Sequence, residues 1–289
     1  MRRSNLIPEN RNCFGPNYPT EYPGEMVKVL GLSYTDRVLD VGGGHNPLPV
    51  ARVILEMDLS DGAHRDGQAI RYSDSACLIQ GDVQSLPFAD HAFDFVYCAH
   101  VLEHVNDPAE ACRELMRVAT RGFIETPRAW TEYVAGHPSH QWLVDLIDGV
   151  LVFTRKPFLE WPFDQIVLAK AQIDPDFYQK ALVTYRNLTC VQLLWDDTFT
   201  FRVTRLPDGI EYSYGDPLTA SRAHFVFACN LLLAQAPLPN VLVHAKEAFL
   251  KVKDPKYAKL VELVETLLDN KVLARPKNKA DLISLGIQP

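Results

Sequence analysis

The sequence lacks the marks of several large classes of protein. None of its six cysteines forms a C-x-x-C pair, so we expect reduced thiols in a cytoplasmic protein and no metal. The longest apolar stretch, residues 223–236, is too short and interrupted to span a bilayer. The basic N-terminus has no apolar run behind it, so no signal peptide is predicted. A net charge of -7 argues against nucleic acid as the main partner.

The 289 residues divide by composition into three parts. Residues 1–35 are rich in Pro, Asn, Tyr and Arg and have turn chemistry at nearly every position. Residues 36–205 alternate apolar strands with turns, and the segment at about 128–185 is an insertion. Residues 206–289 read as a helical C-terminal extension.

The apolar runs of the middle part predict a parallel sheet. Each run is short and nearly free of alternation, which is typical of strands buried on both faces. The predicted strands cover residues 38–41, 53–57, 76–80, 93–98 and 122–125.

Caps and turns place the other elements. Asp107 followed by Pro108 predicts the start of a helix, with Glu110 completing a capping box. Asp148-Gly149 between two β-rich runs predicts a hairpin, and a second hairpin is expected to turn near Asp196-Asp197. Asp-Pro pairs at 216–217 and 254–255 predict helix starts. The face of the second helix contains Tyr257, Leu260, Val261, Val264, Leu267 and Leu268.

A glycine loop directly follows the first strand, as Asp40-Val41-Gly42-Gly43-Gly44. Glycines let a ligand approach the backbone without a Cβ clash. A carboxylate two residues before the first glycine suits a ligand with positive charge better than a pyrophosphate.

Acids also follow the second and third strands. Asp58 is the preferred acceptor for ribose hydroxyls, and Glu56 is the alternative. Asp82 is placed to accept from an adenine amino group, while the backbone N–H of Val83 donates to the ring.

Taken together, D-x-G-x-G, "DVQSLPF" and "HVLEHVNDP" resemble the class I S-adenosylmethionine-dependent methyltransferases, in their small-molecule, "type 11"-like branch. The resemblance covers roughly residues 38–127. It implies a Rossmann-like, doubly wound, mostly parallel α/β sheet of seven strands with one antiparallel strand. It also implies S-adenosylmethionine as cofactor. The residues implied to bind it are Asp40, Gly42, Gly43, Gly44, Asp58, Asp82, Val83, Ala99 and His100.

One departure from the family concerns the first helix. Only 18 positions separate Asp40 from Asp58, and "HNPLPVAR" contains two prolines that prevent a long helix. We therefore expect a shortened first helix, with another segment covering that side of the cofactor. The stretch from Asn17 to Pro23 is the candidate lid.

The loops beyond the fourth and fifth predicted strands are expected to contain the residues that face the substrate. A hydroxyl acceptor must lose a proton, so histidines there are candidate bases. His104 and His140 are the predicted catalytic residues. Glu125, Arg128 and His137 are predicted to face the substrate.

The predicted function is methyl transfer to a hydroxyl of a small polar metabolite, such as a sugar, a lipid precursor or a secondary metabolite. The alternative is a catalytically weak, methyltransferase-like partner or regulatory subunit that binds S-adenosylmethionine. A nicotinamide oxidoreductase is disfavoured because Pro47 stands at the third glycine position. The expected partner is a small molecule, without a membrane span, and the C-terminal helices are the candidate face for a homodimer.

Overall fold

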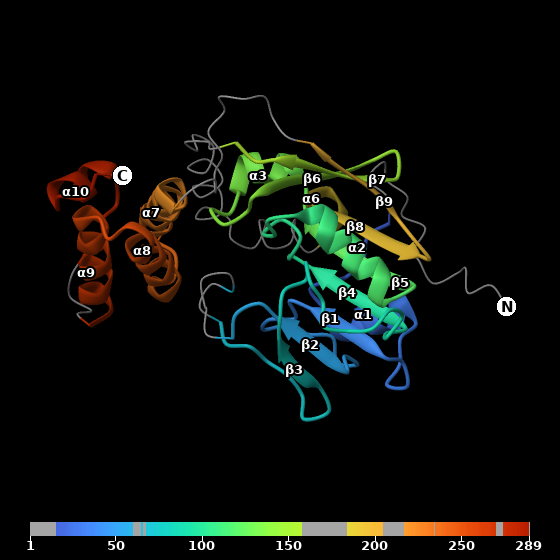
Figure 1. Ribbon diagram of the computed structural model, residues 1–289. Coiled ribbons are helices and arrows are strands. Elements are labelled where there is room, and N and C mark those ends of the chain that lie inside the picture. Colours follow the sequence, from blue (N-terminus) through green and yellow to red (C-terminus); the bar gives the residue numbers. More distant parts are fainter. Residues whose placement is uncertain are drawn as a thin grey trace.

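A computed structural model describes residues 16–59, 65, 68–157, 184–204, 217–233, 235–269 and 274–288. Its centre is a mixed sheet in the order β3-β2-β1-β4-β5-β8 (Figure 1). The strands are β1 (Val38–Val41), β2 (Val53–Glu56), β3 (Cys77–Gln80), β4 (Phe95–Ala99), β5 (Arg121–Pro127) and β8 (Cys190–Asp196). The first five are parallel and β8 runs antiparallel to β5. The α/β class and the mostly parallel sheet are therefore confirmed.

The central strands β1, β4 and β5 and most of β2 are buried on both faces, as their apolar runs predicted, whereas the edge strand β3 has no buried residue. Successive residues of β4 alternate between two cores: Phe95 packs on one side and Val96 on the other. On the first side lies α1 (Pro23–Leu30), through Met26 and Leu30. On the second side lies α2 (Pro108–Val118). The Asp107 carboxylate accepts from the backbone N–H groups of Ala109 and Glu110, so the predicted cap is confirmed.

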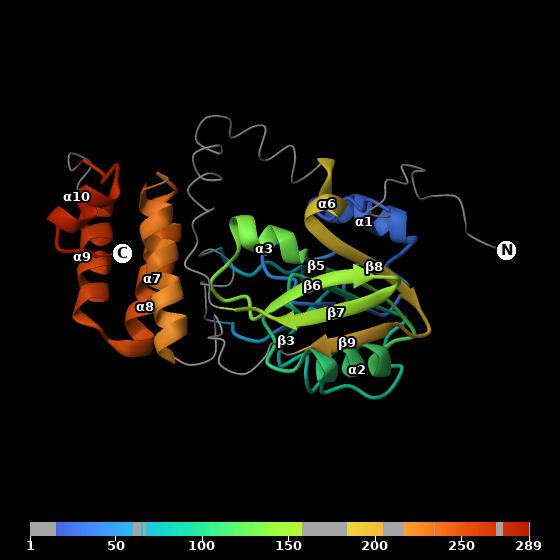
Figure 2. The same cartoon turned by 90° about the horizontal axis from the view of Figure 1, so that it is seen from above.

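A second, three-stranded sheet has the order β6-β7-β9. β6 (Trp142–Ile147) and β7 (Val150–Arg155) form the predicted hairpin, and both of its turn residues have positive φ, 50° at Asp148 and 78° at Gly149. Figure 2 shows this small sheet lying alongside the β5–β8 edge of the main sheet.

The second predicted hairpin is wrong. β9 (Thr200–Thr204) does not pair with β8 but runs parallel to β7. The backbone changes direction at Asp197, where φ is 68° and the N–H donates to the carbonyl of Thr120. In the small sheet, the half-buried Phe201 and Val203 can pack on the core. The central sheet consequently has six strands within the described residues, where the resemblance implied seven.

The C-terminal part is helical, with α7 (Pro217–Leu233), α8 (Leu238–Val252), α9 (Pro255–Asp269) and α10 (Lys279–Ser284). Figure 1 shows these helices to one side of the sheet, and they have a hydrophobic core of their own. Tyr257, Leu260, Val264 and Leu267 are buried in it as predicted, but Leu268 is 38% exposed. Among the described residues, no helix combines the length and apolar character needed to cross a membrane.

The contact between β4, β5 and β8 leaves no room for a side chain at Gly122. A Cβ built there would lie 2.6 Å from a Trp195 ring carbon and 2.6 Å from the Val96 carbonyl oxygen. We predict that Gly122→Ala lowers the free energy of unfolding by about 1–3 kcal/mol, the usual cost of overpacking. Urea denaturation measures it. The matched control is Gly24→Ala in α1, where a Cβ meets nothing within 4 Å. An equal effect of both substitutions would contradict the packing argument.

Candidate functional site

The glycine loop leaves β1 with a backbone that only glycine adopts easily. Gly42 has φ 70°, and a Cβ there would lie 2.4 Å from a methyl carbon of Val101. Its N–H donates to the Leu55 carbonyl oxygen, which fixes the loop to the end of β2. Gly44 also has positive φ, 57°. The loop therefore presents bare backbone at the carboxyl ends of the strands, where α/β sheets bind ligands.

Two buried carboxylates hold this loop. Asp40 accepts a hydrogen bond from the Leu48 N–H at 2.7 Å, and Glu56 accepts one from the Gly44 N–H. Arg65 lies 3.7 Å from Glu56 and partly neutralises it. Burial raises the pKa of Asp40 to about 7, although the Leu48 hydrogen bond opposes this and Glu56 adds to it.

No helix forms between β1 and β2, a segment that the structure describes completely. The loop instead buries Leu48, Val50 and Ala51 in the same core as α1. The shortened first helix is therefore confirmed, and the apolar side chains of the loop fill the space.

The stretch predicted as a lid lies beside the glycine loop. Thr20 and Glu21 line the same cavity as Gly42, Gly43 and Gly44. The stretch is pinned to β8 by two hydrogen bonds between the Tyr18 backbone and the Gln192 amide. Its position agrees with the prediction, and a covering role stays a prediction.

The larger of two cavities at the strand ends measures about 380 Å³. This is within the range of small-molecule sites. Its walls come from the ends of β1, β2 and β3 and from the turn after β4. They bring together, among others, Gly42, Gly44, Glu56, Asp58, Asp82, Val83, His100 and His104.

The smaller cavity measures about 250 Å³ and adjoins the larger one. Both are lined by Gly42, Gly44, Arg65 and His100. The smaller cavity also has Asp40 and Ala99 in its wall, together with a strongly charged group from three further segments. That group consists of Glu21, Glu125 and Arg186.

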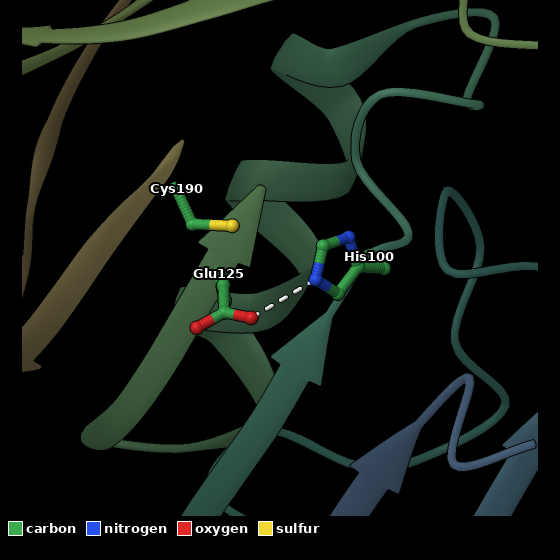
Figure 3. Close-up of side chains that lie close together, drawn as sticks. All are labelled: His100, Glu125 and Cys190. Carbon is green, nitrogen blue, oxygen red and sulfur yellow. Dashed lines mark hydrogen bonds and ion pairs between the residues drawn. The ribbon is translucent and has the colours of Figure 1, made fainter. Parts of the chain in front are cut away.

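Glu125 is the centre of this charged group. His100, at the end of β4, points its ring toward Glu125 on β5, with an Nε2–Oε1 distance of 2.9 Å, and Cys190 lies alongside (Figure 3). The Arg186 guanidinium donates to the same carboxylate oxygen at 2.7 Å. Burial alone raises the pKa of Glu125, but the His100 hydrogen bond and the Arg186 charge lower it to about 2.

His100 sits where the two cavities meet, with 38% of its side chain exposed. Its φ of 57° belongs to the left-handed region and turns the ring back between Glu103 and Glu125. Burial lowers the pKa of His100, but interactions with Cys190, Glu103 and Glu125 outweigh it and raise the pKa well above 6.5.

Five histidines cluster next to the larger cavity. The ring centroids of His104 and His140 are 4.5 Å apart, and His137 lies 5.1 Å from His140. Two more rings come from the C-terminal helices, His224 on α7 and His244 on α8. Burial and the neighbouring histidines hold the pKa of His137 well below 6.5, so its ring stays neutral.

The predicted catalytic and substrate residues divide by position. His104 lines the larger cavity, Glu125 lines the smaller one, and His140 is buried behind His104. Arg128 and His137 line neither cavity. The Arg128 guanidinium is buried and donates to the Asn187 carbonyl oxygen, so it supports the fold beside α6 (Arg186–Thr189).

Sequence reasoning missed several residues that line the site. Arg186, Arg65 and Tyr97 lie in no motif, and nothing local distinguishes them from surface or core residues. Glu56 was named only as an alternative, although the acid at the end of β2 was a usable signal.

Part of the chain is similar to known methyltransferases. The family described as "Methyltransferase domain" matches residues 39–123. A demethylmenaquinone methyltransferase of Renibacterium salmoninarum is 35% identical over 102 residues, 34% of this chain and 42% of that protein. An uncharacterized methyltransferase, YcgJ of Bacillus subtilis, is 28% identical over 109 residues, 33% of this chain and 41% of that protein. The crystal structure of YcgJ has a TM-score of 0.34 at 19% identity, covering 61% of this chain and 94% of that one. The chain thus spans less than half the length of these two curated relatives.

Residues 39–123 thus match a methyltransferase domain, and their motifs resemble those of the class I S-adenosylmethionine-dependent methyltransferases. S-adenosylmethionine is the cofactor of this class, and the residues present fit it. The bare Gly42 backbone allows close approach, while Asp40, Glu56 and Asp58 offer carboxylates to its cationic and hydroxyl groups. The rest of the chain lies outside the matched region.

The pKa of Asp40 predicts how cofactor affinity depends on pH. With a pKa of about 7, the carboxyl of the free protein is protonated below pH 7, whereas a nearby cationic ligand favours the ionised form. Binding must then release a proton. We predict that affinity for S-adenosylmethionine falls by up to about tenfold per pH unit below pH 7 and levels off above it.

Isothermal titration calorimetry from pH 5.5 to 8.5 measures this dependence. The control is Asp40→Asn, which keeps an acceptor for the Leu48 N–H and should bind more weakly with a flat profile. An unchanged slope in Asp40→Asn would assign the titration to another group.

Proposed function

We propose that the protein transfers a methyl group from S-adenosylmethionine to a hydroxyl of a small polar metabolite. The observation that carries the proposal is the pair of adjoining cavities that share the glycine loop and His100. Asp58, Asp82 and Val83 would hold the nucleoside in the larger cavity, and Asp40, Ala99 and His100 would border the methionine end. When bound, the cofactor supplies an activated methyl group, so the chain's own residues mainly provide position and exclude water.

The lining of the smaller cavity supports a small and polar acceptor. Its volume is about 250 Å³, part of which the methionine end would occupy. Glu21, Glu125 and Arg186 are charged groups that can orient hydroxyls through hydrogen bonds. A sugar, a lipid precursor or a secondary metabolite with several hydroxyls matches this surface.

A hydroxyl acceptor must give up its proton, and we place that loss at the histidine cluster. His104 lines the cavity, so it can receive a proton from a bound group. The ring centroid of His140 lies 4.5 Å from that of His104. The Nδ1 atom of His140 pairs with a Glu132 carboxylate oxygen at 2.6 Å. His104 is thus the proposed catalytic residue, and His140 the residue that positions it.

Transfer of radiolabelled methyl from S-adenosylmethionine to pools of polyhydroxylated metabolites tests the function. We expect labelled product with one pool and, for His104→Ala, a kcat lower by about 10²–10⁴-fold with cofactor binding retained. The control is His91→Asn, which alters an exposed residue outside both cavities. Cofactor binding without turnover on any pool would overturn the proposal and favour a regulatory, methyltransferase-like partner subunit.

Asp58 is proposed as the ribose acceptor, and Glu56 as a residue that holds the loop. We predict that Asp58→Ala weakens cofactor binding by about 1–3 kcal/mol, the cost of unpairing polar groups in a site. Competitive binding of S-adenosylhomocysteine measures it, with Asp58→Asn as the conservative comparison. An unchanged affinity in Asp58→Ala, together with a large loss in Glu56→Gln, would assign the ribose to Glu56.

The proposal extends to the partners and the location of the protein. A small-molecule substrate, no nucleic acid, a cytoplasmic location and a homodimer through the C-terminal helices are proposals that fit the net charge of -7 and the helical extension.

A further inference from the structure

The carboxylate of Glu103 is the most unusual polar group among the described residues. Its side chain is 1% exposed, and neither carboxylate oxygen has a hydrogen-bond partner. Burying a carboxylate without partners is costly, so such groups are normally paired or coordinate metals. His100 Nδ1 lies 3.3 Å from Glu103 Oε1 without forming a hydrogen bond, and His140 Nε2 lies 4.0 Å from that oxygen.

Two imidazoles face this carboxylate. Glu103, His104 and His140 each offer one ligand atom, and the three atoms lie within 4.8 Å of one another. Ligand atoms around a tetrahedral zinc ion at about 2.1 Å lie about 3.4 Å apart, so small side-chain rotations close the set. Two histidines and one carboxylate are a donor set used by zinc and by other divalent transition metals.

The second ring nitrogens are already oriented as in metal sites. His140 Nδ1 pairs with Glu132 Oε1 at 2.6 Å, and the other Glu132 oxygen accepts from Lys156 Nζ at 2.7 Å. His104 Nδ1 pairs with the Ser139 hydroxyl at 3.2 Å. Metal-ligating histidines almost always bond their other nitrogen to a carboxylate or another polar group, which fixes the ring. With its Nδ1 paired to Glu132, His140 presents its Nε2 to Glu103 at 4.0 Å from Oε1.

We propose that Glu103, His104 and His140 bind a divalent transition-metal ion, for which zinc is the reference probe. Because His104 and the neighbouring Ser139 line the larger cavity, the remaining coordination position of the ion faces that cavity. There it can bind an acceptor hydroxyl and favour loss of its proton to solvent. This role rests on the proposed methyl transfer, in which the bound ion would replace His104 as the group that promotes loss of the proton. Binding of the ion does not rest on that function.

The other cluster with metal-ligand chemistry, His100, Glu125 and Cys190, is a poorer candidate. The Arg186 guanidinium nitrogen lies 2.7 Å from His100 Nε2 and 2.7 Å from Glu125 Oε1. The permanent positive charge of Arg186 therefore already neutralises that carboxylate, whereas the groups described near Glu103 are imidazoles, with His100 Nδ1 at 3.3 Å and His140 Nε2 at 4.0 Å.

Calorimetric titration of the chelator-treated full chain with ZnCl₂, without methyl donor, tests the site. We expect one ion per chain, with affinity reduced at least 100-fold in both Glu103→Gln and His140→Ala. Glu132→Gln should reduce it by about 10–100-fold through the ring orientation of His140. The control His91→Asn changes an exposed histidine and should bind as the parent does.

Cobalt substitution gives a readout of the ligands themselves. Co²⁺ in the chelator-treated protein should produce visible d–d absorption that is lost in Glu103→Gln and kept in His91→Asn. No binding, or binding that Glu103→Gln leaves unchanged, overturns the proposal. Glu103→Gln is nearly isosteric, so it decides the outcome even if His140→Ala does not fold. Because methyl transfer is not measured, failure here is distinct from failure of the proposed function.

Discussion

The buried carboxylate of Glu125 joins the segments that form the site. It accepts hydrogen bonds from Thr20 of the N-terminal stretch, from Gln192 of β8 and from Arg186 of α6, and it pairs with His100 at the end of β4. The Glu125 backbone carbonyl also accepts from the His100 N–H. A fully buried charge is tolerated only when its partners satisfy it, so losing one partner would loosen several segments at once.

The short connection after the glycine loop is compensated by the segments that Glu125 joins. Where a helix would normally wall the site, Leu48, Val50 and Ala51 pack beneath α1, and the N-terminal stretch reaches the loop from the other side. Thr20 and Glu21 reach the smaller cavity because Tyr18 is tied to Gln192 and Glu21 pairs with Arg186 at 2.9 Å. The wall of the site therefore depends on contacts between residues about 170 positions apart.

The parts of the fold that sequence predicted are those set by local physics. Short apolar runs identified β1 to β5, the Asp107-Pro108 pair predicted the start of α2, and Asp148-Gly149 predicted the turn of the hairpin. The pairing of β9 could not be predicted from sequence, because an alternating strand can pair with β8 or with β7. Only tertiary contacts determine that it pairs with β7. The motifs likewise placed Asp40, Gly42, Asp82 and Val83 at the cavities.

Residues that depend on long-range contacts escaped prediction. Arg186 comes 61 positions after Glu125, and His224 and His244 join the histidine cluster from helices that look purely structural in sequence. Glu103 lies in the "HVLEHV" motif, and sequence gave no sign that its buried carboxylate lacks hydrogen bonds and lies beside histidine rings.

The central claim is that the glycine loop and its cavities hold S-adenosylmethionine. Calorimetry of the full chain with S-adenosylmethionine, S-adenosylhomocysteine and NAD tests it most directly. We expect one site per chain for each of the first two ligands and no measurable heat with NAD. Binding of NAD, with neither of the other two bound, would contradict it.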